Sequence, residues 1–166
     1  MKKSGLIITA LASLLTIASA SAASSQSSYH LRGEPPSGSK IPSVAATAPL
    51  PFDTRYVALS ASHKALIKSA YESMGSNDTP PFPRRGLKQV YQPVIDANNN
   101  IGATGDLVLI ADVNQYGFVE TITVKTSPAQ NLTVKAEEAL RNTRFDPATC
   151  NGQPCRMTFP VKISFQ

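Results

Sequence analysis

The sequence predicts a small α+β domain at the C-terminal end of the chain, with the element order β-β-α-β and one helix covering a three-stranded antiparallel sheet. Three observations predict it. Residues 107–113, 118–125 and 157–165 have strand patterns: apolar and polar residues alternate most regularly in the last segment, as in a strand with one buried face, whereas the first is apolar on much of both faces. A helical spacing of apolar residues lies between the second and third of these segments. The large apolar residues are concentrated in the second half of the chain, so the core is expected there.

Residues 1–22 have the organisation of a cleaved signal peptide. A short lysine-bearing start is followed by an apolar stretch over residues 6–17, and Ala20 and Ala22 end two overlapping A-x-A patterns. Leader peptidase requires small side chains at these positions. The alternative, an uncleaved anchor helix, needs about twenty strongly apolar residues, and the serines after the apolar stretch oppose it. We therefore expect a periplasmic protein without an integral membrane segment after processing.

Charge and composition narrow the classes of partner. The formal net charge is +5, and loss of Lys2 and Lys3 with the signal peptide lowers it to +3. A charge of this size favours weak attraction to polyanions such as anionic glycans. It lacks the clustered basic stripe that a nucleic-acid-binding protein shows, so we expect no nucleic-acid partner.

The stretch before the domain divides into three segments. Residues 23–59 are rich in Ser, Pro and Ala and predict a disordered linker, because such a composition buries too little apolar area to offset its ordering entropy. Residues 60–75 predict an amphipathic helix with Ser60 or Ser62 as its cap and Gly75 at its end. Residues 76–88 form a Pro-rich connector, and residues 89–166 the domain.

Within the domain, the first two strands predict an antiparallel hairpin. Leu107, Leu109, Ala111 and Val113 share one face of the first strand, and Tyr116-Gly117 turns the chain into the second. A helix follows to about residue 142, with Asn131 or Thr133 as the expected cap and Arg141 near its carbonyl end. The last strand, residues 157–165, alternates most regularly of the three.

Cys150 and Cys155 flank an Asn-Gly turn signal, which would place the two sulfur atoms across the neck of a hairpin. In an oxidising periplasm they are expected to form a disulfide. The alternatives are two free thiols or half of a metal site. A structural zinc site needs four ligands, and His30 and His63 are both far away in sequence, so we expect no metal and no other cofactor.

The order and spacing of these pieces resemble the C-terminal domain of TonB-family energy transducers. The resemblance rests on GDLVLIADV at residues 105–113, NQYGFV at 114–119, ITVKTS at 122–127, the helix ending in RFDPA at 144–148, and NGQP at 151–154. It implies a β-β-α-β fold and a periplasmic binding role in transmembrane transport. TonB proteins take the Ton-box peptide of an outer-membrane receptor against a strand of this domain, by β-augmentation.

Two features differ from a full-length TonB: the N-terminus looks removable, and the spacer is short and lacks alternating Glu-Pro and Lys-Pro units. We therefore expect a soluble periplasmic binding module. The alternatives are an anchored transducer of the TonB type and a structural accessory protein that binds peptidoglycan through its basic residues.

No residues suggest catalysis. His63 lies on the polar side of the predicted helix, and Glu137 and Glu138 are adjacent on a helix, so their side chains diverge by about 100°. A nucleophile, base and orienting group that converge are not evident, and we expect no enzyme.

The predicted partner site is the last strand. As a chain-terminal strand containing Pro160, which lacks an N–H, it is expected at a sheet edge, where a peptide can add a further strand. Its outward residues and a Gln- and Tyr-Pro-bearing segment before the first strand, which resembles one in TonB, make up the expected contacts: Arg156, Thr158, Pro160, Lys162 and Ser164, with Gln89, Tyr91 and Gln92.

The A-x-A patterns predict that the mature protein begins at Ser21 or Ala23 and is released from cells by osmotic shock. N-terminal sequencing of the released protein checks this. An intact Met1 in a membrane fraction would contradict the prediction and favour the anchored transducer.

Overall fold

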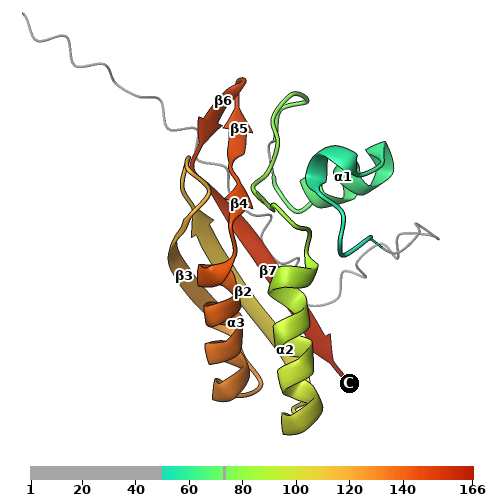
Figure 1. The fold of residues 1–166 in the computed structure, drawn as a ribbon, viewed down its shortest axis with the longest axis vertical. Helices are drawn as coiled ribbons and strands as arrows, with labels where there is room; N and C mark the ends of the chain where they lie inside the picture. The colour runs from blue at the N-terminus through green and yellow to red at the C-terminus, as the bar shows by residue number, and fades with distance from the viewer. Residues whose placement is uncertain (1–49, 73) are drawn as a thin grey trace, which may run out of the picture.

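A computed structural model describes residues 50–72 and 74–166. The signal peptide with Ala20 and Ala22, and most of the predicted linker, lie outside the described residues. Two helices lie side by side across one face of a three-stranded sheet, and a narrow β-hairpin extends beyond one end of the sheet (Figure 1). The α+β class and the three-stranded antiparallel sheet are confirmed. The described residues include no helix that is long and apolar enough to cross a membrane.

The sheet has strand order β3-β2-β7, with β2 (Gly105–Val113) in the centre. β3 (Val119–Thr126) and β7 (Met157–Phe165) pair with it on either side, both antiparallel. The β2–β7 register is unbroken over nine pairs, whereas the β2–β3 register shifts twice. The strand bounds predicted from alternation are confirmed to within two residues, and those of β7 coincide with the prediction.

The β2–β3 turn is closed by Asn114, whose Oδ1 accepts hydrogen bonds from the N–H groups of Tyr116 and Phe118 at 2.9 and 3.1 Å. Gly117 has φ +80°, and a Cβ there would lie 2.1 Å from the carbonyl oxygen of Phe145. The Phe145 N–H in turn donates to the Gly117 carbonyl at 3.0 Å. Glycine is therefore required here by both the backbone angle and the close approach of a second segment.

The helical layer contains one helix more than expected. α3 (Gln130–Asn142) matches the predicted helix, but α2 (Lys88–Ile101) occupies a segment before the first strand in which the sequence predicts no helix. Val90, Val94, Ala97 and Ile101 recur at helical spacing in α2, and this pattern is the signal that was missed. Pro93 concealed it, because proline normally interrupts a helix interior.

The caps of α3 also differ from expectation. Asn131 and Thr133 lie inside the helix, and the N-cap is Ala129, whose side chain makes no capping bond. Thr133 instead bonds to the Ser127 hydroxyl at 2.6 Å. α2 ends at Gly102 in the left-handed conformation, where the Asn98 side chain bonds both the N–H and the carbonyl of Ala103.

The core lies between the sheet and the two helices. Leu107, Leu109, Ala111 and Val113 of β2 are fully buried, which confirms the predicted inner face of this strand. The helices and the strands at either side of β2 contribute the remaining members, and so do residues from the segment preceding α2. They include Leu132, Leu140, Val90, Val94, Phe82, Phe145, Phe159, Val161, Tyr56 and Leu59.

The segment before α2 differs from the predicted linker and helix. The linker was expected to extend to residue 59, but Tyr56, in the short 3-10 helix η1 (Tyr56–Ala58), and Leu59 are buried in the core. α1 (Ala61–Lys68) begins at the predicted cap, Ser60, whose hydroxyl accepts from the His63 N–H. It ends after eight residues instead of continuing to Gly75.

The predicted connector contains a short strand, β1 (Phe82–Pro83), which pairs with β4 (Phe145–Asp146). β5 (Ala148–Cys150) and β6 (Gln153–Cys155) form the projecting hairpin. Asn151 and Gly152 between them both have positive φ, as the Asn-Gly signal predicts for a tight hairpin turn. The Cys150–Cys155 disulfide closes the neck of this hairpin and confirms the expected pairing.

Replacing Cys150 and Cys155 with serine should lower the free energy of unfolding by about 2 kcal/mol or less, because a loop this short constrains the unfolded chain only modestly. Urea unfolding of the variant and the parent protein measures the difference. Titration of two free thiols in denatured, unreduced parent protein would show that the bond does not form.

Candidate functional site

β7 is an edge strand of the described sheet, as predicted, because β2 pairs with only one of its sides. In an antiparallel strand, successive residues direct their N–H and C=O groups to opposite sides. The hydroxyl of Tyr71 donates to the Thr158 carbonyl at 2.9 Å, so Thr158 directs its backbone away from β2. By alternation, the backbone groups of Pro160, Lys162 and Ser164 also face this outer edge.

The first part of the outer edge is covered by the segment that follows α1. Tyr71 is buried and packs with Ala148, Cys150 and Met157 in a small second core, and its hydroxyl bonds to β7. Burial raises the pKa of the Tyr71 hydroxyl, so it stays a donor throughout the physiological range. A peptide that paired at Thr158 would have to displace Tyr71.

The middle of the outer edge offers few donors. Pro160 has no N–H, and it pairs with Ile110 without disturbing the register. Tyr91 of α2 lies beside Lys162: burial raises the pKa of Tyr91 to about 12, and a hydrogen bond with the Lys162 backbone opposes part of that rise. Among Pro160, Lys162 and Ser164, Ser164 is therefore the residue whose outward backbone N–H is present and has no tyrosine beside it.

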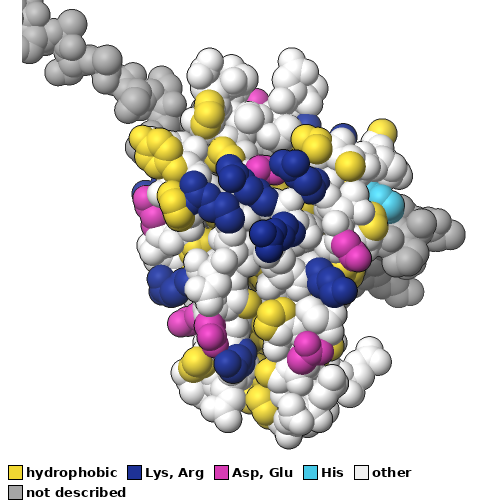
Figure 2. Space-filling view, viewed as in Figure 1, with side chains coloured by type: hydrophobic (Ala, Val, Ile, Leu, Met, Phe, Trp, Pro, Cys, Tyr) yellow, Lys and Arg dark blue, Asp and Glu magenta, His cyan; other side chains and the backbone are white. Residues whose placement is uncertain are grey.

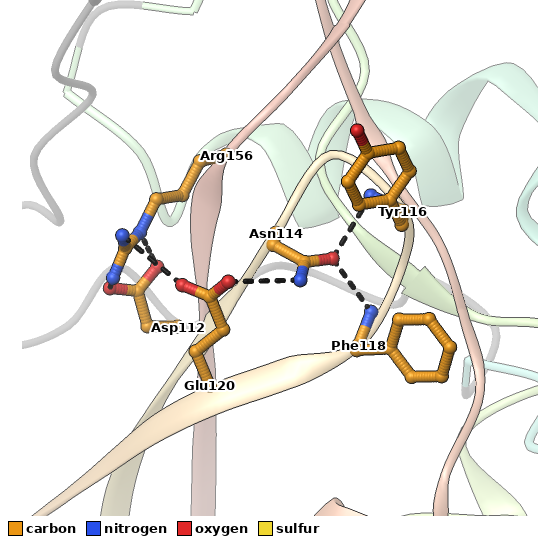
Figure 3. Close-up of polar contacts among 6 residues, drawn as sticks. All are labelled: Asp112, Asn114, Tyr116, Phe118, Glu120 and Arg156. Atoms are coloured by element: carbon orange, nitrogen blue, oxygen red, sulfur yellow. Dashed lines mark hydrogen bonds and ion pairs between the residues drawn. The ribbon is translucent and has the colours of Figure 1, made fainter.

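The outward side chains of β7 are held by ion pairs on the sheet face opposite the helices. Arg156 donates to both carboxylate oxygens of Asp112 on β2 and lies 3.2 Å from Glu120 on β3 (Figure 3). Glu120 also accepts from the Asn114 side chain, which links this cluster to the β2–β3 turn (Figure 3). The hydrogen bonds that Arg156 donates to Asp112 raise the pKa of Arg156. Arg156 therefore ties the three strands together, and its guanidinium already has partners.

The other expected contact residues divide between the strand edge and other surfaces. Ser164 is exposed, and Lys162 is exposed with its Nζ 3.7 Å from Asp106. Of the three residues on α2, only Tyr91 is brought to β7. Gln89 lines a groove between α2 and α3, and Gln92 donates to Asp96 along the helix at 2.8 Å. Because the segment is helical, Gln89 and Tyr91 point in different directions. A contact of Gln89 or Gln92 with a partner stays a prediction.

Residues considered for catalysis do not converge in the structure. His63 lies on α1, and Glu138 forms an exposed pair with Lys135 on α3. The described residues contain no group of three or more His, Cys, Asp or Glu side chains that could hold a metal ion. Of the two tyrosines at the strand edge, Tyr91 was among the expected contacts, whereas Tyr71 was missed from the sequence, since only the tertiary arrangement brings it next to β7.

Comparison with known protein families gives one match. Residues 96–166 match the family described as the C-terminal region of the Gram-negative bacterial TonB protein. The matched range begins within α2 and includes β2, β3, α3 and β7. It leaves out both tyrosines that contact the edge of β7. No curated protein matches the chain.

Replacing Tyr71 with phenylalanine should lower the free energy of unfolding by about 1 kcal/mol, because the Thr158 carbonyl loses its donor while the ring packing stays. Tyr116→Phe is the matched control: the Tyr116 side chain is exposed and its loss should change the stability by less than about half as much. Urea unfolding measures both. Equal stability of Tyr71→Phe and the parent protein would mean that this hydrogen bond does not hold the segment on the strand.

Proposed function

We propose, from the premise that residues 96–166 form a TonB C-terminal domain, that this protein is a periplasmic binding module which takes an extended peptide of an outer-membrane transport receptor by strand addition. The observation that carries the proposal is the edge position of β7 in the described sheet. Recognition uses backbone hydrogen bonds and needs no catalytic group and no cofactor. The family is one of protein contact and energy transduction, which supports a protein partner.

The contacts along β7 support a specific place for the peptide. Toward Arg156 the edge is occupied by Tyr71, and Pro160 supplies no donor. The C-terminal half of the strand, Lys162 to Ser164, combines an outward backbone with exposed side chains. The peptide therefore pairs first with the backbone of Ser164, and pairing that continued to Lys162 would have to displace Tyr91.

The side chains of the inner face contribute indirectly. Phe159 and Val161 are buried against the helices, so they hold the strand in place and are inaccessible to a peptide. Specificity for the peptide's side chains then comes from the exposed side chains of Lys162 and Ser164 and from contact of the peptide with Tyr91. This division between backbone affinity and side-chain selectivity is usual for strand addition.

Replacing Ser164 with proline tests this function. Proline removes the outward N–H of Ser164 and leaves the β2–β7 hydrogen bonds, which use the alternate residues, intact. A Ton-box-like peptide should bind the Ser164→Pro variant about tenfold more weakly, since one hydrogen bond is lost and the ring obstructs the edge. Titration followed by amide chemical shifts measures the affinity and shows where the peptide lies.

Ser164→Ala is the control, because it removes the hydroxyl and keeps the backbone N–H; its affinity should equal that of the parent protein. In the parent protein, the largest shifts should fall on Lys162 to Ser164 and on Tyr91. Unchanged affinity of the Ser164→Pro variant, or shifts that spare β7, would contradict strand addition at this edge.

A further inference from the structure

A second surface lies on the helical face, at the ends of α2 and α3 that are nearest to the β5–β6 hairpin. Figure 2 shows Lys and Arg side chains gathered in the upper part of this face. Five residues at these helix ends or next to them in the chain form what we call the basic surface: Arg84, Arg85, Lys88, Arg141 and Arg144. They come from two segments more than fifty residues apart in sequence, and the Arg84 N–H joins the segments by donating to the Arg144 carbonyl at 2.9 Å.

The positive charge of the basic surface is only partly neutralised. Asp146 is its acidic neighbour, at 3.0 Å from Arg84, and it also pairs with Arg55 at 3.3 Å. Among the described residues, no acidic side chain forms an ion pair with Arg85, Lys88 or Arg141. The N-terminus of α2 lies at Lys88 and adds the partial positive charge of a helix N-terminus. The first turn of α2 contains no acidic residue that would offset this charge. Apart from Asp146, the basic surface therefore has no ion-paired carboxylate in the described part of the chain, and its positive potential stays largely uncompensated.

Arg144 of the basic surface stacks on an aromatic ring. Its guanidinium carbon lies 3.3 Å from the centroid of the Phe118 ring, and its Nη1 is buried without a hydrogen-bond partner among the described residues. Stacking on the ring holds the guanidinium in one orientation, so less entropy is lost when it binds an anion. Phe118 and the neighbouring Tyr116 are 54% and 64% exposed, and they border the basic surface with apolar area.

A groove between α2 and α3 adjoins the basic surface. It has a volume of about 300 Å³, and it is lined by Gln89, Pro93, Lys135, Glu138, Ala139, Asn142 and Thr143. The carboxylate of Glu138 is paired with Lys135 at 2.9 Å, so the two charges offset each other within the groove. The amide side chains of Gln89 and Asn142 can each donate and accept a hydrogen bond, as a peptide backbone requires.

We propose that the basic surface and this groove bind an acidic, extended segment of a protein partner, whose carboxylates pair with Arg85, Lys88, Arg141 and Arg144. The surface is rich in arginine, whose planar fork matches a carboxylate. Arginine beside exposed aromatic residues is also the composition of protein-binding hot spots. The composition therefore favours a peptide over a glycan.

This contact is separate from the proposed strand addition. Ser164 lies near the C-terminal end of β7, at the opposite end of the fold from the β5–β6 hairpin, whereas the basic surface lies toward that hairpin (Figure 1). A partner that carried both an edge-pairing segment and an acidic segment would be held at two points. Two weak contacts on one partner give a higher overall affinity than either alone, provided that the partner spans them.

The experiment is a titration of the protein with a peptide of about ten residues in which Glu and Ala alternate. Amide chemical shifts of the protein report where the peptide binds. Shifts should concentrate at residues 84–89, 116–118 and 141–144, and the affinity should fall as salt is raised. The double variant Lys88→Gln with Arg141→Gln should bind about three- to tenfold more weakly, because two exposed ion pairs are lost. Its thermal unfolding midpoint is measured alongside, so that loss of binding is separated from loss of fold.

Lys125→Glu is the matched control, because it changes the net charge by the same amount on an exposed residue of β3 near the far end of the sheet. Its affinity for the acidic peptide should remain that of the parent protein. Equal weakening in both variants would reduce the effect to net charge and overturn the proposal. Shifts at the basic surface with a muropeptide or with anionic lipid vesicles, and none with the acidic peptide, would overturn it in favour of the cell wall or the membrane. The Ser164→Pro variant should bind the acidic peptide normally, so failure of strand addition and failure of this proposal are distinguishable.

Discussion

The central position of β2 is the constraint on which the rest of this structure depends. Its backbone is paired on both sides, by β3 and by β7, and one of its faces is fully buried by Leu107, Leu109, Ala111 and Val113. A shift of one residue in its register would turn these side chains toward solvent. The long, unbroken pairing with β7 therefore determines which residues of β7 face the helices and which backbone groups face the outer edge.

Ion pairs strengthen the same arrangement on the opposite face of the sheet. Asp112 of β2, Glu120 of β3 and Arg156, which precedes β7, connect all three strands (Figure 3). Their side chains are partly exposed, so each pair contributes little by itself, and the bidentate Arg156–Asp112 geometry matters most for keeping the register. Because this face uses its charges internally, whereas several charges of the basic surface lack acidic partners, the two faces are chemically unlike.

The edge of β7 shows how a strand can be both available and protected. Exposed strand edges invite unwanted pairing, and proteins commonly cover or interrupt them. Here Tyr71 takes the Thr158 carbonyl, Pro160 removes a donor, and Tyr91 lies at Lys162, so a short stretch at the C-terminal end remains for a partner. Both tyrosines precede the range that matches the TonB family, which makes this protection a feature of the chain's preceding segment.

The sequence by itself determined the strands of the three-stranded sheet, the inner faces of β2 and β7, α3 and the disulfide hairpin, because each depends on a local signal: alternation, helical spacing, or an Asn-Gly turn between two cysteines. It also indicated the edge position of β7 through Pro160. Local signals failed at α2, where Pro93 concealed a helical spacing of apolar residues, and at Tyr56 and Leu59, whose surroundings look like a linker but which are buried. Only the tertiary structure decided two arrangements. Tyr71 lies over β7, and residues 84–88 lie beside Arg141 and Arg144. These contacts join segments far apart in the chain, and no pattern within either segment encodes the distance between them.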